Sequence, residues 1–124
     1  MSKFKVLLFC FSLLIAVTSC GLNGPTEGLN QIQARGKTIF DQYCAACHDS
    51  QGENIIVGPP LSHIASSGGE RVVGINAETY IRQSLIEPDA YFVEGFDDLM
   101  PKTFNDILAQ EEIDALIEFL LTLK

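Results

Sequence analysis

The chain has 124 residues, of which 47% are hydrophobic, and its 16 acidic residues outnumber its 8 basic residues to give a formal net charge of −8. This length and composition predict a single globular domain. The acidic balance argues against nucleic acid and anionic membrane surfaces as partners, because both repel a negatively charged protein.

The first 19 residues have the features of a bacterial secretory signal. Lys3 and Lys5 precede an apolar run from Val6 to Val17, which is shorter than the roughly 20 residues that a helix needs to cross a bilayer. Residues 17–21 resemble the site at which bacterial lipoproteins are cleaved and lipidated. We therefore expect residues 1–19 to be a lipoprotein signal peptide and Cys20 to carry the lipid. An ordinary signal peptide and an uncleaved anchor are the alternatives.

A flexible tether and an acidic domain are expected after the signal. Residues 20–30 contain Gly21, Gly24, Pro25 and Gly28 and few apolar side chains, a composition typical of linkers. The folded domain is expected at 31–124. Without its signal peptide the chain has 6 basic and 16 acidic residues, a net charge of −10. A protein partner that is attracted electrostatically should then dock through a basic face, although the acidity could also serve solubility alone.

The first predicted helix runs from Leu29 to Tyr43, because apolar residues recur at three- and four-residue steps. The face that they form consists of Leu29, Ile32, Gly36, Ile39, Phe40 and Tyr43. Gly36 should weaken the helix by about 1 kcal/mol relative to alanine. We interpret it as a point where another helix approaches closely; a helix start or a tolerated defect is the alternative.

Cys44 and Cys47, separated by two alanines and followed directly by His48, have the spacing of a c-type haem attachment site. One helical turn would place both thiols beside neighbouring vinyl groups of the porphyrin and carry the imidazole under the iron. Two other chemistries use such a cysteine pair. A redox dithiol would leave the histidine idle and prefers a βαβ context. A zinc site would need more ligands, and Cys10 and Cys20 lie in or beside the signal.

The segment after the cysteine motif is expected to support His48. Pro59 and Pro60 exclude a helix and keep the backbone extended. A carbonyl of this segment can accept a hydrogen bond from the second imidazole nitrogen, which orients a ligating ring and makes it a stronger donor to the metal. A simple loop corner is the alternative. Ser66 to Gly69 are predicted to form a flexible loop.

A second helix is predicted from about Ala77 to Glu87. Asn76 is typical of an N-cap, Glu78 suits the first turn and Pro88 marks the end. The side chains expected to face the interior are Tyr80, Ile81, Ser84 and Leu85.

Residues 89–105 are predicted to be irregular. They include four aromatic residues, Tyr91, Phe92, Phe96 and Phe104. A loop of this length is unusual in a small domain, and a bulky cofactor that has to be wrapped would account for it. Met100, followed by Pro101, lies in this loop.

The last predicted helix is the most regular in its pattern. One face holds Ile113, Leu116, Ile117, Leu120 and Leu123, and acidic residues occupy the first turn, where they suit the helix dipole. Ala109 is a poor N-cap, so the helix is expected to fray at its start. No segment predicts a strand.

The side of the iron opposite His48 has three candidate occupants: Met100, His63 or no protein group. Met100 is the only methionine besides the initiator, and His63 is the only other histidine. We assign Met100, because His63 follows the proline segment too closely to reach the opposite face. A lone methionine can also be a core filler. Ligation by histidine and methionine raises the haem potential and saturates the iron, which favours an electron carrier over an enzyme.

With these residues in place, the chain resembles the class I cytochromes c over about Gly36 to Leu123. The matching residues are Gly36 and Phe40 on the first helix, Leu116 and Phe119 on the last, Cys44, Cys47 and His48 of the haem motif, Pro59 as carbonyl acceptor and Met100 as distal ligand. The resemblance implies an all-α fold of three to five helices wrapped around one covalently bound haem c. Phe119 stands where tyrosine is common. The docking lysines of mitochondrial members are absent, so their partners are not implied.

Three further stretches are similar to the haem domains attached to subunit II of some haem-copper oxidases and to the monohaem lipoprotein subunits of alternative complex III. They are Tyr80–Leu85 with Pro88, Val93–Phe96, and Met100–Pro101. The likeness implies an electron carrier in a bacterial respiratory or photosynthetic chain, lipid-anchored on the outer, periplasmic face of the cytoplasmic membrane. Its partners would be redox proteins or an integral respiratory complex, with no small-molecule substrate.

Two basic residues, Arg71 and Arg82, are candidates for pairing with the haem propionates; ordinary surface charge is the alternative. Two rival functions remain open at this stage. One is a haem enzyme or gas sensor in which the sixth iron position is open or labile, and the other is a structural subunit whose haem lies off the electron path.

Overall fold

The computed structural model describes residues 28–124. The predicted signal peptide at 1–19, the lipid site Cys20 and most of the predicted tether lie outside the described residues. The described part forms five α-helices and one 3₁₀ turn, without a strand, which confirms the all-α prediction. The elements are α2 (Gln31–Tyr43), α3 (Ile64–Arg71), α4 (Ala77–Ile86), η1 (Pro88–Ala90), α5 (Phe104–Ile107) and α6 (Gln110–Leu120). Among them, no helix combines the length and apolarity that a membrane crossing requires.

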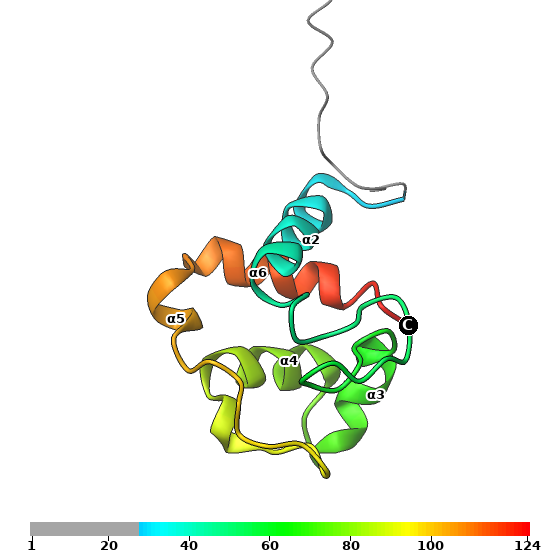
Figure 1. Cartoon of the computed structure of the whole chain (residues 1–124). Coiled ribbons are helices and arrows are strands. Elements are labelled where there is room, and N and C mark those ends of the chain that lie inside the picture. The colour runs from blue at the N-terminus through cyan, green and yellow to red at the C-terminus, as the bar shows by residue number, and fades with distance from the viewer. Residues whose placement is uncertain (1–27) are drawn as a thin grey trace, which may run out of the picture.

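The first and last helices cross directly, with α4 beneath them (Figure 1). Gly36 lies at the crossing, where a Cβ would overlap the carbonyl oxygen of Ala115 and lie 2.8 Å from the Cβ of Phe119. One turn further along, the rings of Phe40 and Phe119 meet at 5.5 Å between centroids and 58° between planes. The predicted role of Gly36 is thus confirmed: the missing side chain brings the two backbones together.

Both crossing helices begin with an ordered turn. The Asn30 side chain accepts from the Gln33 amide at 2.9 Å while the Gln33 side chain accepts from the Asn30 amide at 3.1 Å, a reciprocal cap. The prediction that α6 frays at its start is only partly right. Ala109 offers no side-chain acceptor, but Glu112 reaches back to accept from its amide at 3.0 Å.

The α2 face is narrower than its sequence pattern suggests. Ile39 and Phe40 are buried, but Ile32 is 57% exposed. Because α6 crosses α2 near Gly36, Ile32 lies at the rim of the crossing beside Arg35 and Glu111. Ile32 thus belongs to the apolar face predicted from the sequence but does not join the core.

The predicted loop at Ser66 to Gly69 is instead part of helix α3, and this prediction was wrong. The carbonyl of His63 accepts from the amides of Ser66 and Ser67 and from both hydroxyls, which closes the first turn. A Cβ at Gly68 would lie 3.2 Å from the Tyr80 ring on α4. The small residues that weaken α3 locally also let it pack closely on α4, and this packing compensates for their low helix propensity.

Helix α4 follows the prediction closely. The Asn76 side chain accepts from the Thr79 amide at 2.8 Å, and Pro88 begins the 3₁₀ turn that ends the helix. The buried side chains of α4 are Tyr80, Ile81 and Leu85, and they face the centre of the molecule. Arg82 on the outer side bridges to Asp114 of α6 at 2.8 Å. The helices thus form a scaffold from which two long loops, residues 49–63 and 91–103, extend.

Candidate functional site

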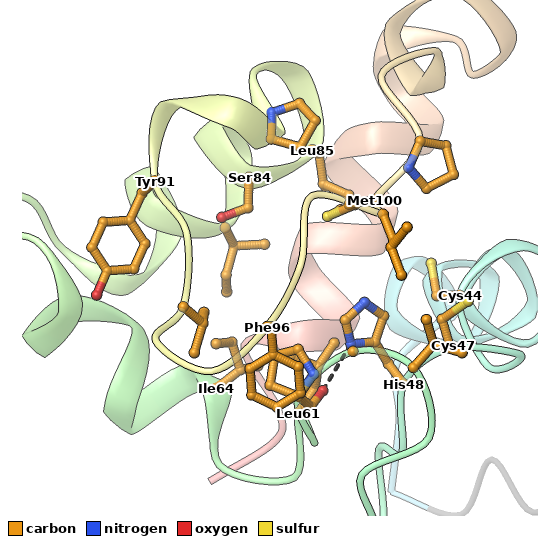
Figure 2. A pocket seen from close by; sticks show the side chains of 18 of the residues that line it. Cys44, Cys47, His48, Leu61, Ile64, Ser84, Leu85, Tyr91, Phe96 and Met100 are labelled. Atoms are coloured by element: carbon orange, nitrogen blue, oxygen red, sulfur yellow. Dashed lines mark hydrogen bonds between the residues drawn. The ribbon is translucent and has the colours of Figure 1, made fainter.

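The cysteine motif lies where α2 ends. Cys44 caps the helix, its amide donating to the Phe40 carbonyl at 2.8 Å, and the amides of Cys47 and His48 both donate to the Cys44 carbonyl at 2.9 Å. The chain thus winds through one more turn after α2. This turn brings both sulfurs and the imidazole to the wall of one cavity (Figure 2).

The cavity lies between the helical scaffold and the two loops, and its space, mouth included, amounts to about 1190 Å³. Its wall is largely apolar and rich in aromatic rings. The aromatic lining residues are Phe40, Tyr43, Tyr80, Tyr91, Phe92, Phe96 and Phe104. Residues 89–105 supply four of these rings, as expected for a segment that wraps a large flat ligand, but they are not irregular throughout, because η1 includes residues 89–90 and Phe104 begins α5.

The imidazole of His48 is held from behind by the proline segment. Its Nδ1 lies 2.8 Å from the carbonyl oxygen of Pro59, and because a carbonyl can only accept, Nδ1 carries the proton. Figure 2 shows the other ring nitrogen pointing into the cavity, toward the side where Met100 lies. Burial lowers the pKa of His48, an effect that the bond to Pro59 partly opposes. The ring is therefore kept neutral, the form that ligates a metal.

Gly58 is a functional residue that the sequence reasoning missed. A Cβ there would overlap Cε1 of His48 and lie 2.8 Å from Nδ1. Only glycine lets the backbone lie flat against the imidazole. The signal was present in the sequence, since a glycine directly before two prolines marks a backbone that something approaches closely.

Met100 lines the same cavity from the second loop and packs against the hydrophobic core. Pro101 follows it, and Lys102 bridges to Asp98 at 2.9 Å and to Asp89 at 3.3 Å, which ties this loop to the end of α4. His63, the rival ligand, does not line the cavity. Its side chain is 63% exposed and lies 3.3 Å from Glu53. Of the two candidates, Met100 is the one placed toward the cavity.

The two candidate propionate partners differ. Arg71 lines the cavity, with its guanidinium 5.5 Å from the centroid of the Tyr80 ring and 3.3 Å from the Tyr80 hydroxyl. Arg82 does not line it, because Asp114 and Glu78 hold its guanidinium on the outer surface. The structure therefore does not bear out the expectation that Arg82 pairs with a propionate.

The thiols do not suit the two alternative chemistries. Burial, followed by the charge of Cys47, raises the pKa of Cys44 to about 12, whereas a redox dithiol depends on a depressed thiol pKa. Within residues 28–124, no group of three or more histidine, cysteine or acidic side chains could hold a metal ion, so a zinc site finds no ligand set there.

The residues at the cavity fit a covalently bound haem. The cavity offers two free thiols on one helical turn, a neutral imidazole with one nitrogen directed inward, and a wide apolar wall. The glycine cradle at Gly58 and the carbonyl of Pro59 hold that imidazole in a ligand's orientation.

Comparison with known proteins agrees with this geometry. No curated protein sequence matches the chain. The family model for cytochrome c matches residues 33–124, which include the cysteine motif, both loops and all of α6. Members of this family bind haem c covalently through such a motif and carry electrons. The chain therefore belongs to the cytochrome c family.

Proposed function

We propose that this chain is a membrane-tethered monohaem cytochrome c that transfers single electrons in a bacterial respiratory or photosynthetic chain, with His48 and Met100 as axial ligands. The observation that carries the proposal is the placement of these two side chains on separate segments, the helical turn after α2 and the loop 91–103, which wall one apolar cavity. The family supports a haem-based electron carrier; the ligand pair, the tether and the role in respiration or photosynthesis are the proposal's own steps.

Each part of the cavity has a task in electron transfer. Cys44 and Cys47 would hold the haem through thioether bonds, and the bound group would supply a one-electron couple. His48 is kept neutral and oriented by Pro59, and the aromatic wall excludes water. With Met100 as the second ligand, the protein would supply both of the iron's ligands outside the porphyrin. Such a site can gain and lose an electron with little rearrangement, and it leaves no open position for a substrate.

Arg71 is the better of the two candidate partners for a propionate. It faces the cavity, and its contact with Tyr80 fixes it by a hydrogen bond and a cation–π interaction. A carboxylate brought to the cavity would find this guanidinium without displacing an existing ion pair, since Arg71 makes none among the described residues.

The charge of the domain favours a basic partner. Residues 28–124 hold 15 acidic and 6 basic side chains, a net charge of −9. Four of the basic side chains, Arg35, Lys37, Arg82 and Lys102, already pair with acidic neighbours. A redox protein or membrane complex with a basic face would be attracted, and added salt would slow the encounter.

The sequence of the N-terminus supports the tether. A lipid on Cys20 would anchor the domain on the outer side of the cytoplasmic membrane, where it could be a subunit of a quinol-oxidising complex or a donor to a terminal oxidase. Mass spectrometry of the protein purified from membranes tests this directly. The expected mass of the mature chain includes one haem and the lipid; a mass with haem but no lipid would contradict the tether alone.

The ligand assignment is tested by the optical spectrum and by Met100→Ala. We expect a low-spin ferric spectrum with the weak far-red methionine–iron band, and loss of that band in the variant. Its midpoint potential should fall by on the order of 0.1 V or more, since axial ligands set haem potentials over about 0.8 V. Ile107→Ala is the matched control, because Ile107 is a large apolar residue that is 52% exposed and does not line the cavity. A high-spin ferric protein that binds cyanide readily would favour a haem enzyme or gas sensor.

A further inference from the structure

The loop that supports His48 is ordered by very few groups. Residues 49–63 contain no helix or strand, and Pro59 and Pro60 have no amide hydrogen to donate. Yet this loop must keep the Pro59 carbonyl 2.8 Å from Nδ1 of His48 and Gly58 flat against the ring. Contacts from other groups therefore have to hold the loop in this position.

One side chain, Asp49, accounts for most of the contacts in the first half of the loop. Its Oδ1 accepts from the amides of Gln51 at 2.9 Å and Gly52 at 3.0 Å. Its Oδ2 accepts from the Asn54 side-chain amide at 2.6 Å and, more weakly, from the Asn54 backbone amide at 3.4 Å. The carboxylate therefore closes residues 51–54 into a tight turn around itself.

The backbone of Asp49 fixes the far end of the same loop. Its carbonyl accepts from the Leu61 amide at 2.7 Å, just beyond the two prolines. The carbonyl of Cys47 accepts from the Gly58 amide at 2.9 Å and from the Val57 amide at 3.3 Å. The segment that touches His48 is thus tied at both ends to the residues that flank His48 in the sequence.

Gly52 provides independent evidence that the turn is built around the carboxylate. A Cβ at Gly52 would lie 3.1 Å from Oδ2 of Asp49 and 3.5 Å from the Asn54 side-chain nitrogen. A side chain at this position would crowd the carboxylate, so the turn packs closely around it.

We propose that Asp49 is a positioning residue for the haem: its carboxylate folds residues 51–54 so that Gly58 and the Pro59 carbonyl are held against the His48 imidazole. The inference deepens the proposed function and rests on its assignment of His48 as an iron ligand. Its consequence is a shift in haem potential. The bond from Nδ1 to Pro59 makes the imidazole a stronger donor and so stabilises the oxidised iron; loosening the loop weakens that bond and raises the potential.

The test compares Asp49→Ala and Asp49→Asn with Glu53→Gln in the haem-loaded protein. Glu53→Gln removes the same charge from the same loop and leaves the Asp49 carboxylate in place. The hydrogen-bond and ion-pair partners of the Glu53 side chain among the described residues are Ser62 and His63, and the glutamine oxygen can still accept from the Ser62 hydroxyl. Asp49→Asn retains an oxygen for Gln51 and Gly52 and loses the acceptor for Asn54. It keeps the test informative even where the alanine variant does not mature.

Two measurements are made on each variant: the midpoint potential, and hydrogen exchange of the amides of Val57, Gly58 and Leu61. In Asp49→Ala we expect exchange about tenfold faster or more, because hydrogen bonds to a charged acceptor are lost, and a rise in potential larger than that of Glu53→Gln. Asp49→Asn should lie between them. Equal potentials in all three variants with unchanged exchange would overturn the proposal and leave only a charge effect.

The same samples separate this inference from the proposed function. The far-red methionine–iron band of the unaltered protein reports the Met100 ligation. Its absence would count against the proposed carrier while the comparison of amide exchange among the Asp49 variants stays readable.

Discussion

Replacing Gly36 with alanine should destabilise the domain by forcing α2 and α6 apart. The added Cβ would overlap the Ala115 carbonyl oxygen, and it would lie 2.6 Å from the Ala115 carbonyl carbon and 2.8 Å from the Phe119 Cβ. Two of these three atoms are backbone, so no side-chain rotation relieves the clash. The helices have to separate, which also loosens the contact between the Phe40 and Phe119 rings.

The expected change in the free energy of unfolding combines two destabilising contributions and one stabilising contribution. Overpacking a core costs about 1–3 kcal/mol, and a weakened aromatic pair adds about 0.5–1.5 kcal/mol. Alanine returns about 1 kcal/mol through its higher helix propensity. The net loss in the free energy of unfolding should be about 2 kcal/mol, which corresponds to a midpoint lower by roughly 8–16 °C in a domain of this size.

Thermal and guanidinium unfolding of the haem-loaded protein, followed by far-UV circular dichroism in one oxidation state, measure this loss. Thr38→Ala on the exposed side of α2 is the control, and it should change stability by only about 0.5 kcal/mol. If Gly36→Ala proves as stable as the control, the two backbones are not in the close contact that the crossing requires, and the reasoning fails.

Three further predictions concern the site and the surface. Gly58→Ala should displace the His48 ring from Pro59 and raise the haem potential. Gly74→Ala is the control: an added Cβ meets nothing within 4 Å, but the positive φ of Gly74 strains an alanine, so this variant should lower stability and leave the potential unchanged. Arg82 holds the pKa of Asp114 below its usual value. Asp114→Asn should therefore lower the free energy of unfolding at pH values above the unfolded carboxyl pKa of 3.8, and this loss should vanish as the pH falls through the lower folded pKa. Unfolding of both proteins at several pH values shows whether their difference in stability disappears in acid. Reduction of the ferric protein by a cationic reagent should slow as salt is added and reduction by an anionic reagent should speed up, and stopped-flow rates that ignore salt would refute electrostatic steering.

The sequence predicted those parts of the fold whose determinants are local. Asn76 and Pro88 delimit α4 as expected, because capping and the missing proline amide act within one turn. The cysteine motif predicted a helical turn with its histidine facing the ligand, and the turn is there. Close approach at Gly36 was the interpretation favoured over a helix start or a tolerated defect, and the structure confirms it, because a position without a side chain leaves room for another helix.

The features that sequence reasoning missed depend on contacts between distant residues. Helix α3 looked like a loop because Gly68 and Gly69 have low helix propensity, but the close packing of Gly68 against Tyr80 outweighs it. Ile32 fits the helical pattern, yet the position of the crossing leaves it exposed. Arg82 was a candidate partner for a haem propionate, whereas Asp114, 32 residues away in the sequence, holds it on the outer surface.

The burial of Cys44 has a consequence for the order of events during maturation. Cys44 is 9% exposed in the folded chain, and burial raises the pKa of its thiol to about 12, which keeps it protonated at neutral pH. Bond formation at sulfur requires a thiol that reagents can reach and that can ionise. In the folded chain the Cys44 thiol lies at the cavity wall but is held in its less reactive, protonated form, so attachment of the cofactor is favoured while the polypeptide is still open.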